Sequence, residues 1–479
     1  MEQSQIMATE FLNKRQEGRK PKKKQKSPKI PRGRSSILPS ARLQTLPPEV
    51  LLKILSFLDA SSLYSIGYVN KKLHELANNN ALWYRLYIRE CTKQKLKTKL
   101  GDEVADRLTI ATIQEKPKGH WKRLLFKKMV GFNQSRWISQ LKAVSPYTGL
   151  PKQTVHVLRS LGVTWELTVT NQDGHQRTFK HSHTFFSECS LNLTWIGLGA
   201  LEYLGIKSMQ LHSVVPLALD RGVASCSRPA WRSLIFEVNM AKFNWRFFGS
   251  CVLVRARHCI SFPGLVMGIW RDNDEVVFFK ANLHLHKLVE KCLLGSISVP
   301  YSMPEHKPLF DDVDPEYGLH GYKVYIELHD MTKLIMSGQF SGLFCRREAV
   351  TKEFVVLQAI SRDKRSQHTA FADKFSLKWR SEGLEGSVEH CCVMSVTVLD
   401  ESQTPFWCVS SPVPIMLSKG VDSRDYDYRG ESYVIRYHGS EGRISLDLVW
   451  MEELGQYFLV MFHIHLPVVK INRYFGRSY

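Results

Sequence analysis

The sequence lacks the features that mark secreted, metal-bound and membrane-spanning proteins. Its 479 residues contain ten cysteines, too few for a disulfide scaffold, and no CxxC pair or other structural zinc spacing occurs. No apolar stretch near the start resembles a secretory signal, and no run of about 18 apolar residues is free of charge and histidine. We therefore expect reduced thiols, no metal site, no signal peptide and no membrane span.

Catalytic signatures are also missing. The sequence has no P-loop, dinucleotide fingerprint or nucleophile elbow. A catalytic triad stays an open alternative, because its residues meet only in the folded chain. Three His-x-His pairs occur, at His181/His183, His284/His286 and His463/His465. On a strand each pair would share a face and offer two metal ligands, but no third ligand follows at a suitable spacing. We interpret them as structural histidines and expect no cofactor and no catalytic residue.

Positive charge is confined to the first third of the chain. The formal net charge is +21, of which residues 1–36 carry +8, residues 37–160 carry +13 and residues 161–479 carry none. This division argues against nucleic-acid binding by the whole molecule. Binding of nucleic acid through residues 1–160 remains an alternative, and steep salt dependence would reveal it.

Residues 1–40 have few large apolar side chains and are predicted to be a disordered basic tail. The segment from Arg19 to Lys26 is a nuclear-import candidate, whose charged residues are Lys20, Lys22, Lys23, Lys24 and Lys26. The alternative is a solvated tail that binds polyanions loosely. The expected localisation is cytoplasmic and/or nuclear.

The best-patterned stretch of the chain runs from Leu43 to Cys91. Leu46-Pro47-Pro48 forms a helix start, and apolar residues then recur at the spacing of one helix face, at Leu51, Ile54, Leu55 and Leu58. Leu52 and Phe57 add a second apolar face. Asp59 is a predicted N-cap for the next helix. Three or four short helices form a thin core, so the two-sided first helix predicts a docking partner.

This stretch resembles the F-box family, and within it the F-box-only class. The family pattern appears in order and at matching spacing as Leu46-Pro47, Leu51–Leu58, Leu63, Val69–Lys72, Leu76-Ala77 and Leu82-Trp83. Two positions depart from it, since Asn70 stands where the family often has Cys and Leu73 where it often has Trp. These departures concern the packing of the third helix. The alternative is an ordinary three-helix domain.

The resemblance implies a function in protein ubiquitination. F-box proteins dock on the S-phase kinase-associated adaptor, which joins a cullin and a RING subunit, and the rest of the chain holds a protein substrate. On this basis the chain is a non-catalytic substrate receptor of an SCF-type ubiquitin ligase. The implied adaptor-binding residues are Leu46, Pro47, Leu51, Ile54, Leu55, Leu58, Leu63 and Trp83. The alternative is a basic adaptor-bound protein with a nucleic-acid or other non-ligase role, and an enzyme in the later region is a further rival.

Residues 92–162 are predicted to be a helical linker. A helix should begin at His120-Trp121-Lys122, and in F-box proteins such a Trp-Lys segment tends to pack on the last helix of the box. Another helix is predicted over Pro151–Leu161, with Gly162 at its C-terminal cap. The many Lys and Arg side chains here suit a solvated helix surface better than a nucleic-acid face.

From Val163 onward the apolar period changes to two, which predicts strands. Thr164–Thr170, a turn at Asn171–Gly174 and a return over Arg177–Phe186 indicate a hairpin, and similar segments recur as far as Tyr457–His465. The fold class is therefore α+β, with a small all-α F-box and helical linker followed by a large, mostly antiparallel, sandwich-like β region. The predicted domains are 1–40, 41–91, 92–162, 163–310 and 311–479. Aromatic residues predicted in turns, Phe406, Trp407, Tyr426 and Tyr428, are candidates for a binding surface, with a buried role as the equal alternative.

Overall fold

The structure is a computed structural model of the chain. It describes residues 46–95, 116–130, 134–217, 230–242, 245–251, 253–259, 264–304, 317–371, 374–381, 383–418, 424–425 and 428–475. The contacts divide the chain into two units, Met1–Ile54 and Leu55–Tyr479. The basic tail and the predicted boundary at residues 310/311 lie outside the described residues.

Short helices make up the first part of the described chain. They are α1 (Pro48–Leu55), α2 (Ala60–Ile66), α3 (Lys71–Ala77), α4 (Asn80–Lys95), α6 (His120–Val130), α7 (Gln134–Leu141) and α8 (Thr154–Ser160). Asp59 caps α2, since its carboxylate accepts a hydrogen bond of 3.0 Å from the Ser62 amide. After α8, Gly162 adopts a left-handed conformation with φ +64, which confirms its predicted place at the helix end.

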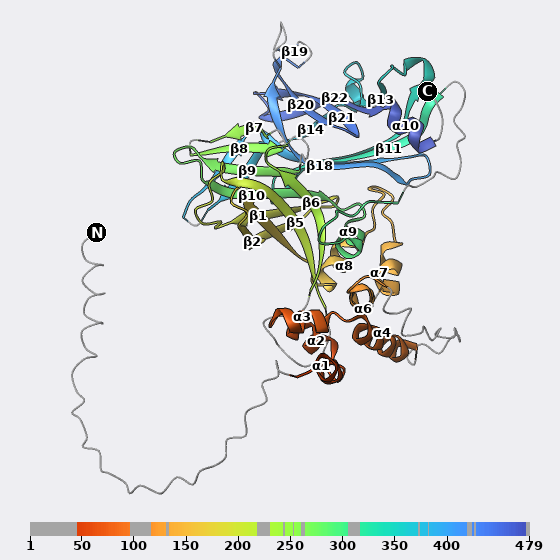
Figure 1. The fold of residues 1–479 in the computed structure, drawn as a ribbon. Helices are drawn as coiled ribbons and strands as arrows, with labels where there is room; N and C mark the ends of the chain where they lie inside the picture. The colour runs from red at the N-terminus through yellow and green to blue at the C-terminus, as the bar shows by residue number, and fades with distance from the viewer. Residues whose placement is uncertain are drawn as a thin grey trace, which may run out of the picture. The chain divides into compact units, whose positions relative to one another are not determined.

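Two antiparallel sheets follow. The four-stranded sheet has the order β2 (Gln176–Lys180), β1 (Thr164–Asn171), β5 (Ile206–Pro216), β6 (Ala230–Asn239). The six-stranded sheet has the order β3 (His183–Phe186), β4 (Ser190–Ile196), β10 (Val276–His284), β9 (Leu265–Trp270), β8 (Val254–Cys259), β7 (Trp245–Ser250). Helix α9 (Leu288–Leu294) lies against β5 and β6 (Figure 1). It also contacts α6 and α8, so the helices join the β region on one side of the four-stranded sheet.

The first hairpin is present, but its return strand is shorter than predicted. β1 pairs with β2 as expected, and Gly174 supplies the turn with φ +83. The chain then leaves this sheet, and β3 pairs with β4 in the six-stranded sheet instead. The expectation of one strand over Arg177–Phe186 is therefore wrong, because a break at His181–Ser182 divides it between two sheets.

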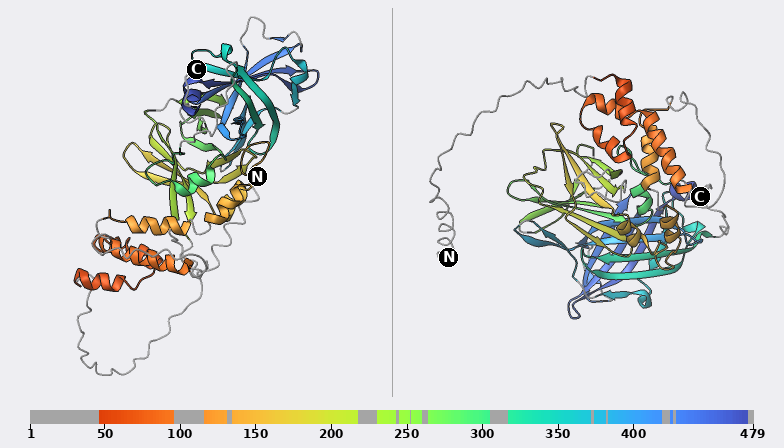
Figure 2. Two further views of the ribbon diagram at one scale, coloured as in Figure 1. Left: turned by 90° about the vertical axis from the view of Figure 1, so that its right-hand side faces the viewer. Right: turned by 90° about the horizontal axis from the view of Figure 1, so that it is seen from below.

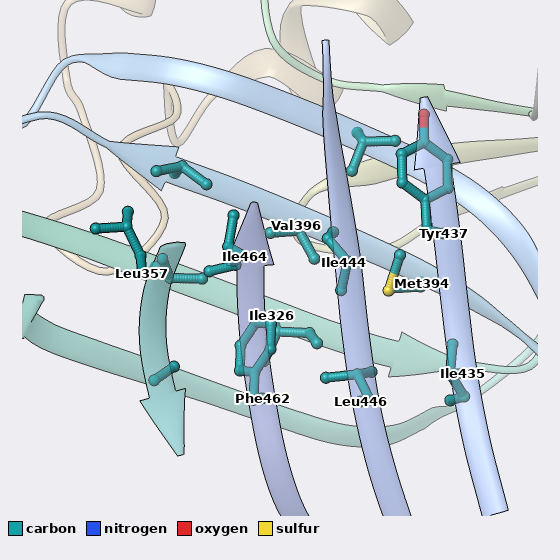
Figure 3. Packing of buried hydrophobic residues seen from close by; sticks show 14 of the residues in the cluster. Ile326, Leu357, Met394, Val396, Ile435, Tyr437, Ile444, Leu446, Phe462 and Ile464 are labelled. Atoms are coloured by element: carbon teal, nitrogen blue, oxygen red, sulfur yellow. The ribbon is translucent and has the colours of Figure 1, made fainter. Parts of the chain in front are cut away.

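A ten-stranded antiparallel sheet contains an extensive hydrophobic core. Its main path has the order β12 (Leu334–Arg346), β11 (Tyr317–His329), β17 (Cys391–Leu399), β18 (Pro405–Leu417), β20 (Gly430–Gly439), β21 (Gly442–Met451), β22 (Gln456–Pro467), β13 (Phe354–Ile360). β14 (Thr369–Phe371) and β19 (Arg424–Asp425) pair with β22 and β20. The outer strands β12 and β13 contact each other, so the sheet nearly closes on itself, as its curvature in Figure 2 shows. Figure 3 shows Ile326, Val396, Ile444 and Phe462 gathered in its interior, each fully buried.

Strand β17 is covered on both faces. Cys392, Met394 and Val396 lie in the interior of the ten-stranded sheet. Cys391 and Val393 lie in a second core with strands of the six-stranded sheet and with the hairpin β15 (Ser376–Arg380) and β16 (Glu385–Glu389). The two adjacent cysteines therefore face opposite sides, as expected for a strand. This second core joins strands from before residue 300 to strands from after residue 317.

These findings confirm the predicted fold class, an N-terminal helical part followed by a large antiparallel β region. Phe406 and Trp407 are a correction. They lie on β18 rather than in a turn, and only 8% and 5% of their surface is exposed. Tyr428 lies in a turn next to His368, and Tyr426 is outside the described residues. The last element among the described residues is α10 (Val468–Phe475).

Candidate adaptor-docking site

Helix α1 has a buried side and an exposed apolar side. Its first turn begins with Pro47 and Pro48, and the Leu51 amide donates to the Pro47 carbonyl over 3.1 Å. Leu51 and Leu55 are each 2% exposed. Val50 and Ile54, one turn apart on the same face, are 44% and 41% exposed. Apolar side chains at helical spacing that remain in water are typical of a binding surface.

The segment after α1, in which Asp59 caps helix α2, exposes further apolar side chains. Phe57, Tyr68 and Val69 are 75%, 71% and 67% exposed. Leu63 on α2 is 1% exposed and belongs to the core of the segment. The exposed groups thus lie in the turns on either side of α2, while the helix itself is anchored by a buried leucine.

Asn70, one of the two departures from the family pattern, has a structural role. Its side-chain oxygen accepts a 2.8 Å hydrogen bond from the Leu73 amide and thereby caps α3. Leu73, the second departure, is 6% exposed and fills a core position. The third helix is therefore begun by a polar cap and buried through a leucine, and neither departure disrupts it.

Trp83 on α4 is completely buried. Its indole N–H donates to the Ala77 carbonyl over 2.6 Å, and its ring meets Phe126 of α6 edge-on, with centroids 5.4 Å apart. Trp121 of α6 packs edge-on against Tyr84 at 4.7 Å. The prediction that the Trp-Lys helix packs on the last helix of the box is confirmed.

Two lysines of α6 are part of this packing. The Lys122 ammonium donates to Asn78 over 3.0 Å and lies 4.9 Å from the Tyr64 ring centre, and burial lowers its pKa. The Lys128 ammonium lies 2.8 Å from the Cys91 sulfur and 5.4 Å above the Tyr87 ring. Both cations therefore hold α6 to the box. This role differs from the two interpretations of the linker lysines given above, a solvated helix surface and a nucleic-acid face.

The predicted adaptor-binding residues fall into three groups. Leu51, Leu55, Leu63 and Trp83 are buried, Leu46 and Leu58 are half-buried, and Pro47 and Ile54 are exposed. The buried members support the box, and their direct contact with an adaptor stays a prediction. The prediction omitted Val50, Phe57, Tyr68 and Val69. Of these four residues, the sequence indicated only Phe57, as part of the second apolar face of the first helix.

The other candidate residues do not form a second functional site in the described part of the chain. Within the described part of the chain, no group of three or more His, Cys, Asp or Glu side chains is arranged to hold a metal ion. His284 contacts the Thr397 hydroxyl at 3.1 Å, and its pKa is lowered well below the usual value, chiefly by burial. No helix among the described residues has both the length and the hydropathy to span a membrane. The nuclear-import candidate lies outside the described residues.

Comparison with known proteins places the chain. A family model described as F-box-like matches residues 43–89. The chain is 33% identical to F-box only protein 15 of Macaca fascicularis, over 91% of this chain and 100% of the relative. It is 34% identical to F-box only protein 15 of Bos taurus, over 92% and 94%. A solved structure, the crystal structure of MucB in complex with MucA(peri), covers 72% of this chain and 97% of its own at 9% identity with a TM-score of 0.10, which carries no fold argument. The chain belongs to the family of F-box only protein 15.

Proposed function

We propose that the chain is the substrate-recognition subunit of an SCF-type cullin-RING ubiquitin ligase. The observation that carries this proposal is the set of exposed apolar side chains in the box, Val50, Ile54, Phe57, Tyr68 and Val69, supported by buried neighbours. Exposed apolar groups on a folded frame are suited to a partner that covers them. In this proposal the S-phase kinase-associated adaptor is that partner, and it brings the cullin and the RING subunit.

The β region would hold a protein substrate, and the rate advantage would come from proximity. A receptor that fixes a substrate lysine near a ubiquitin-charged enzyme raises its effective concentration without forming a covalent bond itself. The chain would therefore contribute binding and orientation, and no residue of it would need to act as an acid, a base or a nucleophile.

The adaptor surface can be tested with single charges at exposed positions. We expect Ile54→Asp and Phe57→Asp, made separately in the full chain, each to reduce recovery of the adaptor at least about tenfold, because each would place an unpaired carboxylate in an apolar interface. The measurement is quantitative co-purification of adaptor and cullin. Val469→Asp on α10 is the matched control, since Val469 is an apolar residue with 79% exposure outside the box.

Both test positions are exposed, so the variants should keep the wild-type unfolding profile. Undiminished adaptor recovery with both variants would overturn the docking assignment. Loss of recovery with Val469→Asp as well would show that the assay reports general damage. Deletion of residues 43–91 should remove adaptor and cullin together, and the proteins that remain bound are substrate candidates.

We also propose that the chain works in the cytoplasm and/or the nucleus, with Lys20, Lys22, Lys23, Lys24 and Lys26 promoting nuclear import. Nuclear entry of a tagged chain that is unchanged by deletion of residues 19–26 would reject the import segment. The alternative role on nucleic acid gains nothing from α6, where Lys122 and Lys128 already have protein contacts.

A further inference from the structure

A cavity of about 420 Å³ opens in the β region, far along the chain from the box. Its walls come from α8, from β3 and the turn that follows it, and from the neighbouring strands β11 and β12. Phe185, Phe186 and Leu334 make much of the lining apolar, while Glu188 and Glu327 add two carboxyl groups. A mostly apolar cavity of this size with a few convergent polar groups is typical of ligand sites.

Glu327 is the unusual member of the lining. It lies on the same face of β11 as Tyr325 and His329, while Ile326 and Leu328 point into the apolar core on the other side. Only 1% of Glu327 is exposed, and its carboxyl oxygens have no well-aligned hydrogen-bond partner among the described residues, although the Ser187 hydroxyl and the Glu188 and Cys189 amides lie close to them. Burial, the largest cause, raises its pKa to about 7, despite opposing contributions from Ser187 and nearby amides.

The neighbours of Glu327 do not neutralise its charge. His329 is the nearest basic group, with Nε2 3.7 Å from the carboxyl oxygen, but burial lowers the pKa of His329 and favours the neutral ring. The same Nε2 lies 3.3 Å from the Ser190 hydroxyl. Cys189 and Tyr325, the other titratable neighbours, both have pKa values raised chiefly by burial, so they too are neutral near pH 7.

Glu188 and Arg159 lie at opposite sides of the rim, and the carboxyl side is the one that suits a cation. Glu188 is exposed and accepts a hydrogen bond of 3.1 Å from the Tyr325 hydroxyl, which leaves its charge beside the opening. The Arg159 guanidinium lies 5.3 Å above the Phe186 ring and closes the wall on the α8 side. A buried carboxylate is costly to ionise unless a cation pairs with it, and Glu327 is one of the residues that line the cavity.

We propose that this cavity binds the cationic end of a lysine or arginine side chain from a protein substrate. Glu327 would pair with the ammonium or guanidinium group, Glu188 would attract it at the rim, and Phe185 and Leu334 would contact the aliphatic stem. The inference rests on the proposed substrate-receptor role and deepens it, because it names the chemistry of the substrate segment.

The test uses the full chain and four small probes: the acetylated amides of arginine, lysine, citrulline and norleucine. Saturation-transfer difference NMR detects weak binding of such probes to a large protein. The expected result is transfer to the arginine or lysine probe at least fivefold above that to citrulline and norleucine. Equal transfer to all four probes, or none to any at 20 mM (a concentration of the order expected for a single side chain), would overturn the proposal.

Three variants locate the binding. Glu327→Gln keeps the shape and removes the charge, and it should reduce transfer to the cationic probe at least fivefold. Leu334→Trp should do the same by filling the opening, without a risk to folding because Leu334 is 50% exposed. Glu385→Gln, at an exposed position on β16, should leave transfer unchanged. Wild-type transfer in both of the first two variants would place binding elsewhere and reject the site.

The same variants separate this inference from the docking proposal. Glu327→Gln should retain full adaptor recovery, and Ile54→Asp should retain transfer to the cationic probe. Loss of adaptor recovery in Ile54→Asp with no probe binding in wild type would reject the cavity alone. Probe binding with undiminished adaptor recovery in Ile54→Asp and Phe57→Asp would reject the docking surface alone.

Discussion

Glu327 imposes a pH-dependent cost on the folded chain. Its pKa is raised from 4.5 to about 7, so the folded state holds a proton that the unfolded state releases between these values. The sign follows from this difference, because stability must fall as pH rises through that interval. At one pKa unit per about 1.4 kcal/mol, the cost at pH 8 is about 3 kcal/mol, and it is below about 1 kcal/mol at pH 5.

We therefore expect Glu327→Gln to raise the free energy of unfolding by about 3 kcal/mol at pH 8 and by less than about 1 kcal/mol at pH 5. Urea unfolding followed by tryptophan fluorescence at the two pH values measures both differences. Glu385→Gln, which removes an exposed carboxylate, should change neither. A Glu327→Gln variant that is less stable than wild type at pH 8 would show that the carboxylate has a partner that stabilises the folded chain.

At the scale of single elements, helix α3 depends on its first residue. The Asn70 side chain caps the Leu73 amide, and α3 has only seven residues, so the cap is a large part of its stability. We expect Asn70→Ala to cost about 1 kcal/mol and to speed amide hydrogen exchange over residues 71–77 about fivefold. Exchange measured by mass spectrometry checks this, with Asn70→Asp as the variant that keeps a capping oxygen. Equal exchange in the alanine variant and wild type would contradict the capping role.

The elements of the box were predictable because their signals are local. The Leu-Pro start, the apolar spacing of α1 and the Asp59 cap all lie within a few residues of the structure they determine. Strands such as β9 and β13 were predictable from composition and alternation over six or seven residues. Local patterns of this kind do not depend on what the element packs against.

Strand β18 contains Pro412 and Pro414, residues that argue against a central strand. The structure gives the physical reason why they fit. β18 pairs with β17 through residues 405–414, but with β20 only through residues 415–417. Over the prolines one side of β18 is therefore not bonded to β20, and a residue without an amide hydrogen is accommodated there. Phe406 and Trp407 lie on this same strand, and they were therefore wrongly predicted to lie in a turn.

The cavity at Glu327 was not predictable from the sequence. Its lining residues come from α8, β3, β11 and β12, and Val155 and Leu334 at its limits are far apart in the chain. Glu327 and His329 alternate with apolar residues on β11, which is the ordinary pattern of a strand with one polar face. Only the pairing of strands across the molecule shows that this face is buried.

On the scale of the whole molecule, the regions before and after residues 305–316 share a core. Trp379 of β15 stacks on Phe278 of β10, with ring centroids 6.3 Å apart, and meets Trp270 of β9 edge-on at 5.8 Å. The buried Lys280 ammonium donates to the Lys378 carbonyl. The predicted boundary at 310/311 therefore separates the two regions in the sequence only, because their sheets pack against each other in the fold.

We expect fragments 1–310 and 311–479 to be insoluble when expressed alone and to form a soluble complex when expressed together. Each fragment alone would expose apolar side chains of the shared core, at a cost of roughly 1.5–3 kcal/mol for each large one. Solubility and size-exclusion chromatography give the result, and Trp379→Ala should weaken recovery of the complex. A soluble, cooperatively unfolding 311–479 fragment would instead support two independent domains.

The double burial of β17 also has a consequence for how the chain matures on the ribosome. Strands β8 and β9 emerge early, yet their packing partners Cys391 and Val393 are translated more than a hundred residues later. At about 5–20 residues per second, the apolar face of the six-stranded sheet stays uncovered for roughly 6–27 s in every round of synthesis. This interval would make the nascent chain a client of chaperones, and a truncated product ending before β17 a substrate for quality control.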